Sequence, residues 1–208
     1  MTKKLTIFGA IAVFIYLFHI VLGGILWTGY SHLMQPISDL TATGAPDREL
    51  LSMITFIYGL CAILFTVSAY LYLKNDVPKI ARTGLISFII MHCVSILYGL
   101  FPVDLPGAAV TFTGIMHIVI TVVIIPLTII SPILIGLGLR KHKQFKIFAT
   151  YSIITGIFIF IAGGTTAYFF ANKLPYFGLV ERINIGTLQL WTLIFSLKLF
   201  RKEIGELE

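Results

Sequence analysis

The sequence predicts an all-α polytopic membrane protein, a bundle of six transmembrane helices that forms a single integral membrane domain over residues 1–208. Hydrophobic residues make up 58% of the 208 residues and charged residues 12%, whereas soluble domains average about 45–50% and about 25%. This composition excludes a soluble enzyme, a disordered regulator and a disulfide scaffold. Crossing a bilayer takes roughly 20 apolar residues of helix, and six runs are long enough: approximately 5–27, 50–73, 83–101, 115–139, 147–171 and 183–200.

Local patterns support the individual spans. The first run is too long for a signal-peptide core, so we expect it to be retained as a helix. Before the second run, Pro46 suits a first helical turn, and Asp47 and Glu49 complement the positive end of the helix dipole. In the fourth run, Pro126 and Pro132 remove backbone hydrogen bonds and predict a bend. Small residues spaced four apart in the fifth run predict close helix packing.

The distribution of Lys and Arg between the loops predicts the orientation of the bundle. Twelve basic residues fall on one side of the predicted membrane and three on the other, and such an excess marks the cytoplasmic side. We therefore expect a multi-pass protein of the cell membrane with both the N and the C terminus in the cytoplasm. Because the basic residues lie in short gaps between apolar runs, they do not indicate a nucleic-acid partner. The twelve are Lys3, Lys4, Lys74, Lys79, Arg82, Arg140, Lys141, Lys143, Lys146, Lys198, Arg201 and Lys202, and the three are Arg48, Lys173 and Arg182.

The first outer loop, residues 28–49, carries the densest group of polar side chains. His32, Gln35, Ser38 and Asp39 alternate there with apolar residues. This pattern suits a segment that lies in the membrane interface or dips into it, where irregular backbone is tolerated only under the cover of protein. We expect the loop to wall a polar pocket that faces the extracytoplasmic side.

Two further candidates lie around the connection between the third and fourth spans. Asp104 falls in a turn rich in Pro and Gly, where its carboxylate suits bonds to nearby backbone amides. His117 follows about one turn into the fourth span. Either it is a structural histidine with its hydrogen bonds satisfied, or it is a base or ligand of the pocket.

Charged residues also stand at the outer boundary of the sixth span. If the last helix begins a few residues before its apolar run, Glu181 and Asn184 share one face and Arg182 occupies the neighbouring one. An ionisable group near the membrane is a functional candidate, because removing it from water is costly. The alternative is structural: Glu181 or Arg182 pairs with Asp39 or Asp104 and locks the outer ends of the bundle.

Two histidines lie deeper. His19 and His92 both fall about 12–14 Å inside the outer boundary, at 1.5 Å of helix rise per residue. Two histidines at matching depth on two helices suit the axial ligation of a b-type haem. The alternative is that both are structural histidines, buried and hydrogen-bonded. The cofactor content stays undetermined at this point.

These motifs resemble those of known membrane families. The run from Pro36 to Asp39, with a glycine and a proline before the second span, resembles the first-loop signature of the six-span FRAG/DRAM/SFK group. The turn from Phe101 to Asp104, His117 and the Glu181–Arg182 pair are more similar to an uncharacterised bacterial and archaeal family, domain of unknown function 998. The resemblance spans most of the chain in topology and is sharp at about a dozen positions.

The FRAG/DRAM/SFK resemblance implies a role linked to lipids, such as remodelling of anchor lipids or effects on membrane phospholipids. Ser38, Asp39 and His117 match that group's first-loop motif and fourth-span histidine. Glu181 matches an acid before the last span, but Arg182 stands where the group has an aromatic residue.

The leading hypothesis is therefore an extracytoplasmic-facing polar pocket that binds or processes a membrane lipid. A serine, an acid and a histidine together permit a base-activated nucleophile; the catalytic candidates are Ser38, Asp39 and His117. The ligand-binding candidates are His32, Asp104, Glu181, Arg182 and Asn184. A water-activating metal is a further possibility, with candidate ligands His32, Asp39, His117 and Glu181.

Two other classes of function remain open. One is a non-catalytic sensor or accessory subunit, with another membrane protein or a second copy of the chain as its partner. The other is a small-solute transporter. Transport is disfavoured because no Asp, Glu, Lys or Arg falls at the midplane of a predicted span, where ion-coupled carriers usually have one.

Overall fold

The computed structural model describes residues 2–201, which form helices and no strands. Within these residues, six helical stretches are long and apolar enough to cross a membrane, which confirms the predicted all-α class with six spans. Lys202, one of the basic residues used to predict the orientation, lies outside the described residues. The elements are α1 (Thr2–Leu5), α2 (Phe8–Leu26), η1 (Ile37–Thr41), α3 (Arg48–Leu73), α4 (Lys79–Ser95), η2 (Ile96–Gly99), α5 (Phe112–Leu139), η3 (Lys143–Phe145), α6 (Lys146–Ala171) and α7 (Phe177–Arg201).

The helix boundaries depart from the hydropathy runs mainly at α7. This helix begins at Phe177 rather than near residue 183, because the backbone N–H groups of Gly178 and Leu179 donate to carbonyls of the first loop. The first turn of α7 is thus capped by a distant segment, which hydropathy does not detect. The expectation that Pro46 lies in the first turn of α3 is wrong, because the helix begins at Arg48. Asp47 is its N-cap residue but makes no side-chain cap hydrogen bond, and its backbone is left-handed with φ of 52°.

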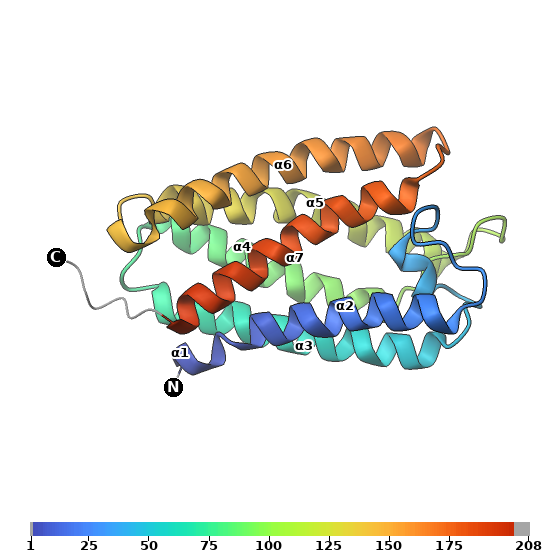
Figure 1. The fold of residues 1–208 in the computed structure, drawn as a ribbon, viewed down its shortest axis with the longest axis horizontal. Helices are drawn as coiled ribbons and strands as arrows, with labels where there is room; N and C mark the ends of the chain where they lie inside the picture. Colours follow the sequence, from blue (N-terminus) through green and yellow to red (C-terminus); the bar gives the residue numbers. More distant parts are fainter. Residues whose placement is uncertain (1, 202–208) are drawn as a thin grey trace.

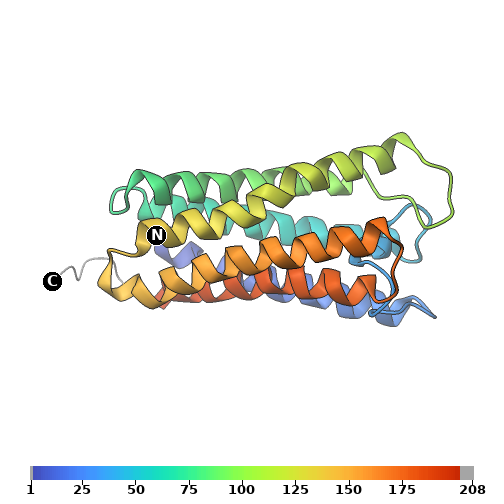
Figure 2. The same ribbon diagram turned by 90° about the horizontal axis from the view of Figure 1, so that it is seen from above.

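The six long helices form a closed ring. Each packs against its neighbours in the chain, and α7 also packs against α2. Figures 1 and 2 show the connections at two ends. The short-loop end carries the turns after α3 and α5 together with α1 and the end of α7. The long-loop end carries the first loop, residues 27–47, and the connection at residues 100–111. The short-loop end is the one we expect in the cytoplasm.

Glycines allow the helices to approach closely on one side of this ring. A Cβ atom added to Gly138 of α5 would lie 2.8 Å from the backbone nitrogen of Ala81 in α4. One added to Gly156 of α6 would lie 2.8 Å from the carbonyl oxygen of Ile129 in α5. Small residues therefore set the spacing of α4, α5 and α6, as the spacing of small residues in the fifth run predicts.

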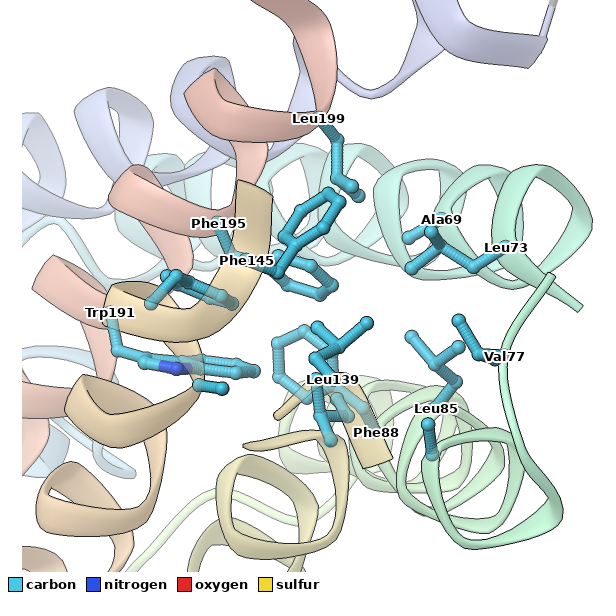
Figure 3. Packing of buried hydrophobic residues seen from close by; sticks show 14 of the residues in the cluster. Ala69, Leu73, Val77, Leu85, Phe88, Leu139, Phe145, Trp191, Phe195 and Leu199 are labelled. Atoms are coloured by element: carbon cyan, nitrogen blue, oxygen red, sulfur yellow. The ribbon is translucent and has the colours of Figure 1, made fainter. Parts of the chain in front are cut away.

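Aromatic side chains fill the interior in the short-loop half of the bundle. The ring of Phe195 lies 5.1 Å from that of Phe148 and 5.2 Å from that of Trp191, and Trp191 lies 5.2 Å from Phe88. Figure 3 shows Trp191, Phe195, Phe88 and Leu139 converging on a common centre. We call Phe88, Phe148, Trp191 and Phe195 the aromatic core.

Candidate functional site

Arg182 holds the first loop against the beginning of α7. Its Nη1 donates to the carbonyl oxygen of Gln35 at 2.8 Å and to that of Gly178, one helical turn back, at 2.9 Å. Its Nη2 donates to the Tyr30 hydroxyl at 2.6 Å and lies 3.3 Å from Nδ1 of His32. Arginine has only donors, so His32 accepts through Nδ1 and carries its proton on Nε2.

Glu181 fixes the same loop from the neighbouring position. Its Oε2 accepts a 2.6 Å hydrogen bond from the backbone N–H of Ile37, the first residue of η1. Gly178 allows this contact because a Cβ there would collide with the carbonyl oxygens of Gln35 and His32. Glu181 and Arg182 therefore dock the loop chiefly through its backbone and Tyr30, a structural arrangement that differs from the predicted pairing with Asp39 or Asp104.

Asp39 is the buried carboxyl group of the loop. It is 2% exposed, and its Oδ2 has no hydrogen-bond partner among the described residues. Burial raises the pKa of Asp39 from 3.8 to about 6, and a hydrogen bond with Gln35 acts in the opposite direction. Between these two values the folded protein holds the proton more tightly than the unfolded chain does. Stability therefore falls as the pH rises through that interval, by about 3 kcal/mol.

The side chains around Asp39 influence one another electrostatically. Burial raises the pKa of Tyr30 to about 12; the charge of Arg182 and its hydrogen bond lower it, while Glu181 and Asp39 raise it. Partial burial and the charge of Arg182 lower the pKa of His32. The structure thus brings these five residues into one group at the long-loop end, between the first loop and α7.

The connection before α5 forms a second polar group. Asp104 accepts hydrogen bonds from the backbone N–H and hydroxyl of Thr111, at 2.8 and 2.7 Å. Thr111 is the N-cap of α5 and accepts from the N–H of Gly114 at 3.1 Å. Asp104 thus braces the start of α5, in the backbone-bonding role predicted for it. The backbone N–H of Thr43 donates to the Val103 carbonyl at 2.9 Å, which ties this turn to the first loop.

His117 belongs to this second group. Its Nδ1 lies 2.9 Å from the carbonyl oxygen of Phe101, which can only accept, so Nδ1 carries the proton and Nε2 is an acceptor when the ring is neutral. The ring lies 4.5 Å from that of Tyr98, whose hydroxyl is 2.9 Å from that of Thr121. The hydrogen bond of His117 therefore anchors it to the turn after α4.

The predicted catalytic and metal arrangements are not assembled in the described residues. Ser38 is half-buried, and no hydrogen bond joins Ser38, Asp39 and His117 within residues 2–201. No three His, Cys, Asp or Glu side chains there come close enough to hold a metal ion. Asn184, one of the ligand-binding candidates, has a buried Oδ1 without a partner in the described part of the chain.

The deep histidines are buried, but the hydrogen bonds expected for them are missing. Both ring nitrogens of His19 and of His92 lack a partner among the described residues. Tyr30, Tyr58 and Gln189 are not among the predicted site residues, because their contacts join segments that are distant in the chain. The sequence feature that points to Gln189 is its position on the same face of the last helix as Arg182.

Six apolar helices in a closed ring, with polar side chains at one end, define a polytopic helical membrane protein. Within that class, the chain belongs to the DUF998 family of proteins of unknown function, which matches residues 10–198. This confirms the resemblance to domain of unknown function 998, and the likeness to the FRAG/DRAM/SFK group stays a prediction. No curated protein and no solved structure matches the chain.

Proposed function

We propose that this protein binds a membrane lipid inside the long-loop half of its bundle. One observation carries the proposal: the buried polar atoms that lack partners gather in this half and at mid-bundle, whereas apolar rings fill the other half. Within the described residues, the Nε2 atom of Gln144 is the only unpaired buried side-chain atom at the short-loop end. The others belong to His19, Asp39, Arg48, His92, Arg182, Asn184 and Gln189.

A lipid suits this site better than a water-soluble solute. The first loop exposes Leu33 and Met34 beside its polar residues, a combination typical of segments that lie in the membrane interface. The outer surfaces of the helices are also apolar. A molecule reaching the site from the bilayer therefore meets an apolar approach followed by hydrogen-bonding groups.

The geometry favours binding over chemistry or transport. Arg182 and Glu181 already hold the loop, and within the described part of the chain Ser38 is not hydrogen-bonded to a base that would activate it as a nucleophile. The aromatic core packs across the short-loop half, which opposes a continuous path for a solute. Lipid processing and a role as sensor or accessory subunit remain predictions from the sequence.

The experiment is to identify the lipids that copurify with the protein. The chain is purified in mild detergent, and the lipids released on denaturation are quantified per mole of protein by mass spectrometry. We expect a lipid retained in stoichiometric amount that is lost in Asn184→Leu and His92→Leu. The matched control, His142→Leu, changes a histidine at the short-loop end and should retain the lipid. A wild-type protein that carries only traces of bulk membrane lipid would refute the proposal.

A further inference from the structure

A set of polar side chains lies deeper in the bundle than the first loop. This interior polar cluster consists of Tyr16 and His19 of α2, Tyr58 of α3, His92 of α4 and Gln189 of α7. Ring centroids are 6.1 Å apart for His19 and Tyr16, 4.9 Å for Tyr16 and Tyr58, and 6.2 Å for Tyr58 and His92. Nε2 of Gln189 donates to the Tyr58 hydroxyl at 3.0 Å. Four helices therefore contribute to one part of the interior.

The cluster contains hydrogen-bonding atoms that the protein leaves unpaired. His19 and His92 are 2% and 3% exposed, and within residues 2–201 neither ring has a partner for its two nitrogens. Oε1 of Gln189 also has no partner among these residues. Buried polar atoms in native proteins are nearly always hydrogen-bonded, and elsewhere in this bundle Ser131 donates to the Leu127 carbonyl of its own helix. The cluster therefore needs partners from outside the chain.

Depth and charge define what those partners are. His19 and His92 each lie seven residues inside the long-loop ends of their helical stretches, at Leu26 and Gly99, or about 10 Å along the helix axis. The cluster contains no Asp, Glu, Lys or Arg, and both Nη atoms of Arg182 are bonded to the first loop or to its own helix. A charged headgroup at this depth would be costly without a counter-charge.

We infer that the interior polar cluster binds the uncharged headgroup of a membrane lipid, one that carries hydroxyl or carbonyl groups. This inference rests on the proposed lipid-binding function and names the class of lipid. It differs from binding of a phospholipid headgroup at the first loop, which would sit at the membrane surface and bear a charge.

The hydrogen-bonding capacity of the cluster matches such a headgroup. A neutral imidazole supplies one donor and one acceptor, and the Gln189 carbonyl is an acceptor. The Tyr58 hydroxyl accepts from Gln189 and keeps its own proton for donation. Below the cluster, the Phe88 ring lies 4.8 Å from His92 and 5.2 Å from Trp191. The aromatic core therefore forms the floor at which the headgroup stops.

The test compares charged and uncharged probes on the full chain. Purified protein, stripped of lipid, is titrated with dioleoylglycerol, decylubiquinone and phosphatidylglycerol, and bound states are counted by native mass spectrometry. The first two probes distinguish a hydroxyl-bearing from a quinone headgroup. We expect at least one of them to bind saturably and more tightly than phosphatidylglycerol. His19→Phe, His92→Phe and Gln189→Leu should each weaken that binding at least tenfold, and Ser131→Ala should not.

The stability of the variants separates loss of a ligand from loss of the fold. The substitutions His19→Phe and His92→Phe remove unpaired polar atoms, so both variants without lipid should melt no lower than the lipid-free wild type. A lower melting temperature would show that water already satisfies the histidine rings, and it would overturn the inference. Preference for phosphatidylglycerol, or neutral-lipid binding unaffected by the three substitutions, would also overturn it while leaving lipid binding intact. Failure of the wild type to bind any of the lipids would overturn the proposed function as well.

Discussion

Replacement of Arg182 by methionine tests whether this side chain holds the first loop in place. Methionine keeps much of the apolar stem but removes the bonds to the Gln35 carbonyl at 2.8 Å and the Tyr30 hydroxyl at 2.6 Å. Hydrogen bonds to a charged group contribute about 1.5–3 kcal/mol each, so we expect a loss of about 3–6 kcal/mol. For a chain of this size that corresponds to a fall in melting temperature on the order of 10 °C.

Two readouts check this expectation in detergent-solubilised protein. Thermal unfolding followed by fluorescence reports global stability, and limited proteolysis reports release of the first loop. Arg182→Lys keeps the charge but not the planar fork, so we expect an intermediate effect. Lys173→Met is the control, because Lys173 is an exposed cation at the same end. A change in melting temperature of about 1 °C or less corresponds to less than the contribution of one such hydrogen bond. If Arg182→Met melts within that range of the wild type and the loop stays protected from proteolysis, the docking role is wrong.

Three further predictions concern single positions. Asp39→Asn should abolish the fall in stability of about 3 kcal/mol between pH 3.8 and about 6, measured as a flatter pH profile of the melting temperature than that of the wild type. Thr111→Val should remove the cap of α5 and cost about 1–2 kcal/mol, seen as faster hydrogen exchange in its first turn. Gly138→Ala should cost about 1–3 kcal/mol by forcing α4 and α5 apart, whereas Gly164→Ala, which meets no atom within 4 Å, should melt like wild type.

The sequence predicts the six spans well because bilayer thickness imposes a long apolar run on every span. All six runs became helices, and the error at α7 arose where the first loop supplies the cap. Hydropathy describes each segment by itself. It therefore misses a helix start that depends on carbonyl groups 140 or more residues earlier in the chain.

The sequence predicts which residues form the candidate site better than it predicts what each of them does there. The polar side chains of the first loop and the Glu181–Arg182 pair do meet at one end of the bundle. Their use as clamps on backbone atoms was not predictable, because the sequence does not show where carbonyl and N–H groups lie. The Tyr58–Gln189 contact joins residues 131 positions apart, so only the folded arrangement reveals it.

If a lipid headgroup lies in the interior of the long-loop half, as we propose, it can be observed directly. The most direct measurement is an electron cryomicroscopy structure of the protein in nanodiscs made from native membrane lipids. We expect headgroup density inside the ring of helices, within hydrogen-bonding distance of His19, His92 or Gln189, with acyl chains leading out to the bilayer. Lipid density confined to the outer surface, with these three side chains bonded to ordered water alone, would contradict it.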